Sequence, residues 1–442
     1  MHTPKTLITL ILAAGESKRM LSETPKTLHS LGGQPVVAWI MNACAHLPSA
    51  DTCVVASPKL AGDPRFQKIL PASTRVAIQE PPRGTGDAVC KGLDQMPSTL
   101  DRDVLVVLGD TPLLTPQTLQ EFHAHYIQQK ADLSVLAVRP PNPLGYGRLI
   151  TSGPQVERIV EEKEADETTK AITLCNGGAM ILGPQAQTML SQIDSANKAG
   201  EYYLTDLVYL LKIKGLSVTF FEAPFEEALG INTRADLAKA EAILQGRLRQ
   251  KALDQGVTLM DPESTYLSFD TSFSEDVTLF PHVFLGPGVT LGRDSTVFAF
   301  SVLENTLLKP GARVGPFCHL RHGTTVGEGA VIGNFVEVKQ SVIGTGTSAK
   351  HLSYIGNATI GAHANIGAGT ITCNYDGQAK HETVIGDKAF IGSNSSLIAP
   401  VTIGDHALIA AGSVITKSVP ENTLAVGRAR QTHLPRKRPQ AP

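Results

Sequence analysis

Aliphatic residues recur at every sixth position through most of the second half of this 442-residue chain. The series run through residues 267–303, 314–338 and 385–415, and a glycine follows many members, as at Gly286 and Gly333. A random apolar-rich sequence would not keep this register over so many repeats. The pattern predicts short strands whose aliphatic side chains stack into one continuous core.

Each six-residue step is expected to form one strand and one turn of a parallel β-helix, and the glycines permit the turn dihedrals. Spacing alone does not set the hand, and parallel crossovers are generally right-handed. The pattern resembles that of hexapeptide-repeat proteins, which wind left-handed and commonly trimerise with active sites between neighbours. The resemblance therefore implies a left-handed parallel β-helix. A break in register at residues 373–384 predicts a loop that leaves the coils.

The first half alternates short apolar runs with segments of helical length. Such alternation predicts a mostly parallel, Rossmann-like sheet with helices on both faces and ligands beyond the carboxyl ends of its strands. The strands expected are residues 7–14, 52–57, 103–110, 133–138 and 217–223.

A helix is expected over residues 233–254, because apolar residues from Leu237 to Ala252 recur at three- or four-residue spacing. Thr233 is its expected N-cap, and Asp236 stands three residues on, as in a capping box. The chain is thus predicted to contain an α/β domain over 1–231, a linker helix over 232–254 and a β-helical domain over 255–442.

Composition narrows the class of protein. The net charge of -2 gives no basic field for nucleic acid or a membrane surface. No apolar run approaches the ~20 residues of a membrane helix, and the run at 7–14 is expected to be a buried strand rather than a signal peptide. Six cysteines without a CxxC pair are typical of reduced thiols in the cytoplasm. The basic, proline-rich tail from Arg430 is expected to be a mobile end.

Three motifs in the first half carry chemistry. The turn LAAGESKRM follows the first strand, so its backbone N–H groups and Arg19 can meet a phosphate. Lys26 follows Pro25 and can reach the same phosphate. Asp110 ends the most apolar strand, where a carboxylate can hold Mg²⁺ together with phosphate oxygens. The alternatives are an ordinary strand–turn–helix junction, a solvated lysine and a helix-capping aspartate.

These motifs together resemble those of sugar-1-phosphate nucleotidyltransferases. Further matches in order are QEPPRGTGDAV, GYGRLI, IVEEK, CNGGAM, GEYYLTD and GIN, and in the second half HLSYIG, NIGAGTITCNYDG and KHETVIGDKAFIGS. From about residue 7 to 430 the chain resembles the bacterial bifunctional N-acetylglucosamine-1-phosphate uridylyltransferases and glucosamine-1-phosphate N-acetyltransferases. That family acetylates glucosamine 1-phosphate with acetyl-CoA, then transfers uridylyl from UTP to N-acetylglucosamine 1-phosphate, which supplies peptidoglycan and lipopolysaccharide precursors.

The resemblance implies roles for residues of the first half. Arg19 and Lys26 would stabilise phosphate charge as catalytic residues, and Asp110 and Asn232 would coordinate Mg²⁺. The residues implied to bind nucleotide or sugar are Leu12, Ala13, Ala14, Gly15, Lys26, Gln79, Gly84, Thr85, Gly109, Asp110, Gly147, Glu161, Asn176, Tyr203, Thr205 and Asn232. Among them the resemblance implies that Gln79, Gly84 and Thr85 read uracil, and that Gly147, Glu161, Asn176, Tyr203 and Thr205 hold the acetylated sugar. The sugar phosphate would attack the α-phosphorus of UTP and release pyrophosphate, so that positioning and charge stabilisation do most of the catalysis.

For the second half the resemblance implies His351 as the base that takes a proton from the attacking amine. The residues implied to bind the sugar phosphate are Arg321, Lys339, Tyr354, Asn365 and Lys380. Those implied to line the acetyl-CoA site are Ala368, Asn374, Tyr375, Ser393, Ala411 and Arg428. The resemblance also implies a homotrimer that acts on small molecules, without nucleic-acid or membrane partners.

Three positions depart from the family's pattern: Ser17 and Lys18 replace glycine and threonine in the turn, and Leu108 stands where tyrosine is frequent. Other functions stay open. A carbonic anhydrase would need histidines converging on zinc, and here only His319 and His322 have suggestive spacing. A nucleotidyltransferase whose β-helix serves only in assembly, or a scaffold with two degenerate sites, would keep the fold but lack one or both activities.

Overall fold

The computed structural model describes residues 7–15, 18–97 and 101–435. The chain divides into two compact units between Leu244 and Gln245. This division falls inside α9 (Arg234–Asp254), the helix expected between the two halves. The polar side chains of Thr233 and Asp236 form the expected capping box: Asp236 Oδ2 accepts from the Thr233 N–H at 2.8 Å, and the Asp236 N–H donates to Thr233 Oγ1 at 3.1 Å.

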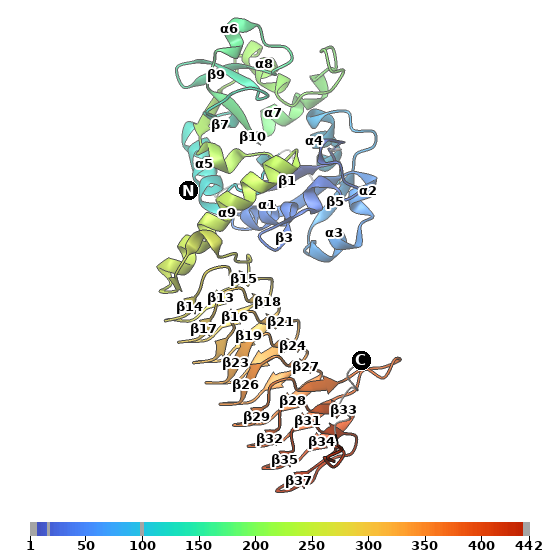
Figure 1. The fold of residues 1–442 in the computed structure, drawn as a ribbon. Coiled ribbons are helices and arrows are strands. Elements are labelled where there is room, and N and C mark those ends of the chain that lie inside the picture. Colours follow the sequence, from blue (N-terminus) through green and yellow to red (C-terminus); the bar gives the residue numbers. More distant parts are fainter. Residues whose placement is uncertain (1–6, 16–17, 98–100, 436–442) are drawn as a thin grey trace, which may run out of the picture. The chain divides into compact units, whose positions relative to one another are not determined.

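The first unit is built on a nine-stranded sheet in the order β5-β4-β1-β6-β10-β7-β11-β9-β8. Figure 1 labels β1, β5, β7, β9 and β10 of this sheet. Within the described residues, β10 and β9 run against the other strands, so the expected mostly parallel sheet is confirmed. The five strands expected from sequence are β1 (Leu7–Ala13), β4 (Ser49–Ala56), β6 (Val104–Leu108), β7 (Leu133–Val138) and β11 (Val218–Glu222). The strands not expected are β5 (Arg75–Ile78), β8 (Arg148–Ser152), β9 (Gln155–Val160) and β10 (Cys175–Leu182).

Helices cover both faces of this sheet. Alternate residues of β1 point to opposite sides, so Leu10 packs in one core and Ile11 in the other. The core that contains Leu10 includes α4 (Thr85–Leu93) and α8 (Asp206–Ile213), and the opposite core includes α1 (Val36–Cys44) and α5 (Pro116–Gln129). Smaller elements are β2 (Ser30–Leu31), β3 (Gln34–Pro35), α2 (Pro58–Ala61), α3 (Pro64–Ile69), α6 (Glu167–Lys170) and α7 (Pro184–Thr188).

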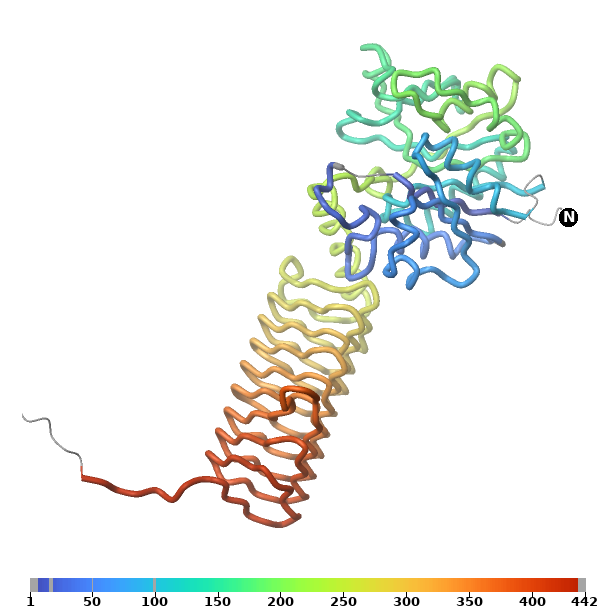
Figure 2. Tube along the Cα trace, turned by 90° about the vertical axis from the view of Figure 1, so that its right-hand side faces the viewer, coloured from blue at the N-terminus to red at the C-terminus, as the bar shows by residue number. Residues whose placement is uncertain are grey.

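The second unit is a parallel β-helix whose coils are visible in Figure 2. Three sheets of ten, eight and eight short strands form its sides, and we call them sides A, B and C in the order in which the chain visits them. Side A contains β12 (Thr258–Leu259), β14 (Thr278–Leu279), β17 (Thr296–Val297), β20 (Arg313–Val314), β23 (Val331–Asn334), β26 (Ser348–His351), β29 (Asn365–Ile366), β32 (Phe390–Ile391), β35 (Leu408–Ile409) and β37 (Leu424–Ala425).

Sides B and C complete each coil. Side B contains β15 (Phe284–Leu285), β18 (Val302–Leu303), β21 (His319–Leu320), β24 (Glu337–Lys339), β27 (Tyr354–Gly356), β30 (Ile371–Cys373), β33 (Ser396–Ile398) and β36 (Val414–Ile415). Side C contains β13 (Ser272–Phe273), β16 (Thr290–Leu291), β19 (Thr306–Leu308), β22 (Thr324–Val326), β25 (Val342–Ile343), β28 (Ala358–Ile360), β31 (Thr383–Ile385) and β34 (Val401–Ile403).

The predicted six-residue register forms the core of this unit. One cluster of buried residues runs through the coils from Ala252 to Val419 and includes the repeat residues of all three sides. The predicted loop is also confirmed, because residues between Cys373 and Thr383 form a short hairpin closed by a bridge between Tyr375 and Lys380. As a result, 25 residue numbers separate the paired residues Asn365 and Phe390, whereas neighbouring pairs differ by 17 or 18.

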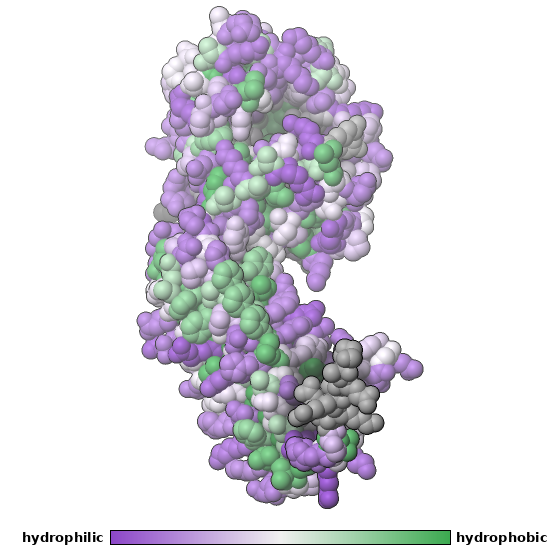
Figure 3. All heavy atoms as spheres, in the orientation of Figure 1, coloured by the Kyte–Doolittle hydropathy of each residue, from purple (hydrophilic) through white to green (hydrophobic). Residues whose placement is uncertain are grey.

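None of the described helices is long and apolar enough to cross a bilayer. Hydrophilic residues cover much of the visible face, with hydrophobic patches between them (Figure 3). All six cysteines lie within the described residues and are unpaired.

Truncation of an inward repeat residue tests the core. Leu291 is fully buried on β16, and its neighbour Thr290 is exposed. We expect Leu291→Ala to lower the free energy of unfolding of the β-helical unit by about 2–5 kcal/mol, because the neighbouring coils cannot collapse into the cavity. Thr290→Ala should change it by less than about 0.5 kcal/mol. Urea unfolding of both variants measures the difference, and equal losses would contradict the assigned register.

Candidate active sites

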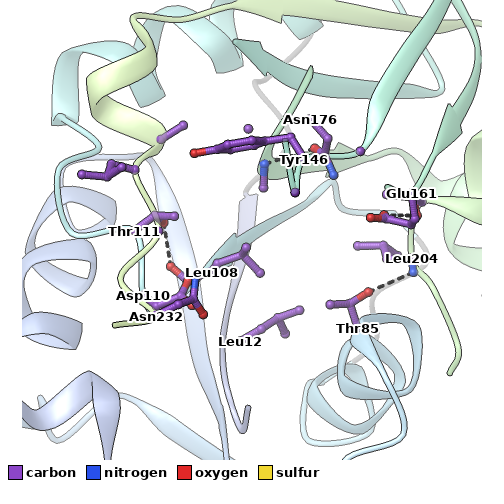
Figure 4. A pocket seen from close by; sticks show the side chains of 18 of the residues that line it. Leu12, Thr85, Leu108, Asp110, Thr111, Tyr146, Glu161, Asn176, Leu204 and Asn232 are labelled. Atoms are coloured by element: carbon purple, nitrogen blue, oxygen red, sulfur yellow. Dashed lines mark hydrogen bonds between the residues drawn. The ribbon is translucent and has the colours of Figure 1, made fainter. Parts of the chain in front are cut away.

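Two adjoining cavities of about 430 and 410 Å³ open beyond the carboxyl ends of β1 and β6. They share Leu12, Thr85, Leu108 and Asp110, so one continuous site has two compartments. Figure 4 shows Leu12 and Leu108 between Asp110 with Asn232 on one side and Thr85 with Glu161 on the other. The position agrees with the general rule for ligand sites in open α/β sheets.

The backbone at Gly109 places Asp110 in the site. The Gly109 N–H donates to the Leu12 carbonyl at 2.8 Å, and a Cβ on Gly109 would lie 2.9 Å from the Cβ of Ala13. Only glycine therefore allows β1 and β6 to end so close together. Asn232 reaches the same point because the Ile231 N–H donates to the Asp110 carbonyl at 2.9 Å.

The Lys26 ammonium lies between the two expected magnesium ligands, Asp110 and Asn232. Lys26 forms an ion pair with Asp110 and lies 3.2 Å from Asn232 Oδ1, and the side chains of Lys26 and Asp110 are only 12% and 15% exposed. Carboxylate and amide oxygens are hard ligands that suit Mg²⁺, which takes few protein ligands when phosphates supply others. The donors thus fit the expected ion. No cluster of three or more histidine, cysteine or acidic residues able to hold a metal occurs among the described residues.

The second compartment contains most of the predicted nucleotide contacts: Ala13, Ala14, Gly15, Lys26, Gln79 and Gly84 line it. Gly84 has a φ of +118°, and a Cβ there would lie 2.5 Å from the Tyr202 carbonyl oxygen. The loop is held in this conformation because the Gly86 N–H donates to that carbonyl at 2.8 Å. Arg19 lines the first compartment, whereas Ser17 and the side chain of Lys18 lie outside the described residues.

The first compartment contains the predicted sugar contacts: Gly147, Glu161, Asn176, Thr205 and Asn232 line it. Glu161 accepts a hydrogen bond from Thr205 Oγ1 at 2.9 Å, and burial raises the pKa of its carboxyl group. The Asn176 N–H donates to the Gly147 carbonyl at 2.8 Å, which joins β10 to the loop before β8. Tyr203, which was also expected to contact the sugar, is not among the described residues that line this compartment.

The sequence did not predict the ion pair between Arg148 and Glu162, which supports this compartment. Arg148 is 2% exposed, bonds to the Tyr146 carbonyl and pairs with Glu162 at 2.8 Å. Glu162 also accepts from the Gly145 N–H at 3.1 Å. Burial alone would raise the pKa of Glu162, but the bonds from Arg148 and Gly145 lower it. The pair therefore fixes the loop 144–147, which lines the compartment.

Removing this guanidinium tests its role. We expect Arg148→Met to lower the free energy of unfolding of the first unit by about 3 kcal/mol, because Glu162 loses its partner and the Tyr146 carbonyl its donor. Arg158→Met, at an exposed arginine of β9, should cost no more than about 1 kcal/mol. Chemical unfolding of both variants measures this, and equal stabilities would contradict a structural role for Arg148.

His351 ends β26 at the corner that joins side A to side B. Its Nδ1 lies 2.9 Å from Oδ1 of Asn334, the residue paired with it on β23. An amide oxygen only accepts, so Nδ1 carries the proton and Nε2 of the neutral ring is left with a lone pair. The side chain is exposed. This arrangement suits a base that takes a proton from a ligand.

The predicted acetyl-CoA residues fall at two different corners. Ala368, Ser393 and Ala411 lie with His351 at the first corner, each two residues beyond the paired positions Ala349, Ile366, Ile391 and Ile409. Arg428 packs near Gly412 at the same corner. Asn374 and Tyr375 instead belong to the hairpin at the corner between sides B and C. Within one chain these two groups do not meet at one corner.

The predicted sugar-phosphate residues gather on side B and at its corner with side C. Arg321 directly follows β21, Lys339 ends the neighbouring strand β24, and Lys380 lies in the hairpin. The neighbouring ammonium of Lys380 lowers the pKa of Lys339, and Arg321 pairs with Glu337 at 2.8 Å. Tyr354 begins β27 on side B, whereas Asn365 begins β29 on side A. The close cations suit an anionic ligand.

Fold and sites define a nucleotidyltransferase joined to a hexapeptide-repeat transferase. A family model described as MobA-like NTP transferase domain matches residues 9–172, and one described as Bacterial transferase hexapeptide (six repeats) matches residues 305–340 and 382–417. The latter agrees with the expected left-handed β-helix.

Curated relatives cover nearly the whole chain. Bifunctional protein GlmU of Azorhizobium caulinodans is 45% identical over 428 residues, which cover 97% of this chain and 95% of the relative. Bifunctional protein GlmU of a Bradyrhizobium species is 45% identical over 431 residues, covering 97% and 96%. The chain belongs to the GlmU family of bifunctional proteins. A solved inositol-1-phosphate CTP transferase from T. maritima has a TM-score of 0.44 and 13% identity, covering 54% of this chain and 94% of that one.

Proposed function

We propose that the chain makes UDP-N-acetylglucosamine in two steps. The β-helical unit acetylates glucosamine 1-phosphate with acetyl-CoA, and the first unit then transfers uridylyl from UTP to N-acetylglucosamine 1-phosphate with release of pyrophosphate. The observation that carries the proposal is the presence of two built sites in a member of a bifunctional family: a two-compartment cavity in which Asp110 and Asn232 hold the Lys26 ammonium, and an exposed His351 oriented by Asn334.

In uridylyl transfer the protein positions two anions. UTP occupies the compartment lined by Gln79 and Gly84, and the acetylated sugar occupies the one lined by Glu161 and Asn176. Asp110 lies between them, where the sugar phosphate attacks the α-phosphorus in line with the leaving pyrophosphate. Arg19 and Lys26 stabilise the negative charge that spreads over the phosphate oxygens.

Asp110 and Asn232 hold Mg²⁺ in this proposal. When bound, the ion neutralises phosphate charge and orients the triphosphate. Lys26 contacts both ligand oxygens in the free protein, so it is well placed to move onto a phosphate when another cation takes its place.

In acetyl transfer His351 accepts the proton that the attacking amine loses. Its Nε2 lone pair is available because Nδ1 donates to Asn334. Lys339 and Lys380 bind the phosphate of glucosamine 1-phosphate, which relieves their mutual repulsion. The thioester carbon of acetyl-CoA then receives the amine, and coenzyme A leaves as thiolate.

The acetyltransferase acts as a homotrimer. The predicted acetyl-CoA residues lie at two corners of one prism, so a second copy is needed to bring a hairpin to the His351 corner. That corner carries an exposed ladder in which the rings of His282, Phe300, Phe317 and Phe335 stack at centroid distances of 4.7, 5.0 and 5.2 Å. Such an apolar edge favours burial against another subunit. The free thiols and the substrates suit the cytoplasm.

A coupled assay of the purified chain tests the proposal. Glucosamine 1-phosphate and acetyl-CoA should give free thiol, and N-acetylglucosamine 1-phosphate with UTP and Mg²⁺ should give pyrophosphate. Unacetylated glucosamine 1-phosphate should be a much poorer uridylyl acceptor. A folded protein that releases neither product would support a scaffold, and one that releases only pyrophosphate would support a nucleotidyltransferase whose β-helix serves assembly.

A further inference from the structure

Asp87 fixes the orientation of the one side-chain amide in the nucleotide compartment that is expected to contact the base. Gln79 is 4% exposed and lines this compartment just after β5. Its Nε2 donates to the Gly84 carbonyl at 2.9 Å and to Asp87 Oδ2 at 2.7 Å. Asp87 lies in the first turn of α4, the helix that begins beside Gly84.

Both partners of this amide are acceptors only. A carbonyl oxygen and an ionised carboxylate have no proton to donate, so only the NH₂ group of Gln79 can face them. Reversing the amide would place Oε1 against two oxygens and leave two acceptors without a donor. The bond to Asp87 is the stronger constraint, because hydrogen bonds to a charged group are shorter and stronger than those between neutral groups.

The same constraint leaves Oε1 as the free end of the amide, and no described residue donates a hydrogen bond to it. With UTP in this compartment, as proposed above, the Oε1 acceptor of Gln79 faces the edge of uracil, which has a single donor. The Watson–Crick edge of uracil presents O2 and O4 as acceptors and N3–H as its only donor. Oε1 can therefore bond to uracil only at N3–H, whereas N3 of cytosine is an acceptor and would oppose it.

We propose that Asp87 is a positioning residue that makes the uridylyltransferase select uracil over cytosine by locking the Gln79 amide with Oε1 toward N3. The inference rests on the proposed uridylyl transfer. Asp87 itself need not touch the nucleotide, since it acts through Gln79. Without its charge, the remaining bond to Gly84 holds the amide less firmly, and Nε2 can turn to meet N3 of cytosine.

Asp87→Asn tests this, because asparagine keeps the shape but can accept or donate. We expect the ratio of kcat/KM for UTP to that for CTP to fall about tenfold, the difference between a charged and a neutral hydrogen-bond partner. Asp94→Asn is the matched control, since Asp94 is the C-cap of the same helix and is exposed; its ratio should stay that of the unaltered protein. Acetyl transfer, catalysed by the other unit, should be unchanged in both variants.

A measurement without mutation covers the case in which Asp87→Asn fails to fold. The unaltered protein should use 3-methyluridine 5′-triphosphate at least ~100-fold less well than UTP, because N3 then has no proton to donate. An unchanged UTP/CTP ratio in folded Asp87→Asn, an equal fall in Asp94→Asn, or efficient use of the methylated nucleotide would each overturn the inference. Failure of the unaltered protein to use UTP at all would instead refute the uridylyltransferase proposal.

Discussion

Acetyl transfer should fall by about 10²–10⁴-fold when His351 is replaced by alanine, while uridylyl transfer stays within about twofold. The amine must lose a proton when it forms the amide, and His351 has a neutral-ring lone pair on Nε2 because Asn334 accepts from Nδ1. The side chain is exposed at the end of β26, so the substitution removes little packing. Thiol release from acetyl-CoA and pyrophosphate release from UTP measure the two activities in the same preparation.

His363 provides the control for this experiment. It is also an exposed histidine at a corner of the β-helix, but this corner lies between sides C and A. His363→Ala should therefore retain both activities. If His351→Ala acetylated glucosamine 1-phosphate at the normal rate, another group would have to accept the proton, and the assignment of the base would be wrong.

Asp110→Ala should lower the rate of uridylyl transfer at least ~10³-fold relative to the unaltered protein and leave acetyl transfer intact. Two side chains face the Lys26 ammonium: the charged carboxylate of Asp110 and the neutral amide of Asn232. Without the carboxylate, the expected ion and the triphosphate lose their common anchor. Pyrophosphate release reports the activity, and Mn²⁺ binding in the presence of UTP, followed by electron paramagnetic resonance, should weaken in parallel.

Asp94→Ala, at an exposed aspartate of the same unit, should bind Mn²⁺ and UTP normally. Loss of both activities in Asp110→Ala would indicate misfolding or coupling between the units rather than loss of a ligand. Undiminished Mn²⁺ binding would show that the ion is held elsewhere.

Repetition made the β-helix the most predictable part of the fold. Its inward positions, such as Leu285 and Ile391, are fully buried in the register that the sequence predicts. The α/β unit was predictable where a strand is a continuous apolar run, as in β6. It was not predictable at β10, because Gly177 and Gly178 interrupt the apolar pattern and Gly178 has a φ of +85°. Those glycines allow close approach to Leu136 and Leu108, which only the folded sheet reveals.

The candidate sites divide in the same way. Residues in recognisable motifs, such as Asp110 and Glu161, line the cavity to which they were assigned. The residues that hold others in place gave no signal. Arg148 resembles a surface arginine in a strand, yet it is buried because a glutamate fourteen positions away meets it. Asp87 resembles an ordinary first-turn acid of a helix, and only the distance to Gln79 reveals a second role.

Because the coils stack on one another, the number of coils before His351 sets its position along the axis of the β-helix. A whole added coil between β14 and β20 would move every later residue outward by roughly 4.8 Å and leave the neighbours of each corner unchanged. Adding only six residues would instead move every later residue to the next side, so that the corners of the later coils would no longer line up with those of the earlier coils. Length variation in this part of the molecule is therefore expected in full circuits, and the hairpin after Cys373 shows the other tolerated solution, an insertion at a corner after which the chain continues on the next side, from β30 on side B to β31 on side C.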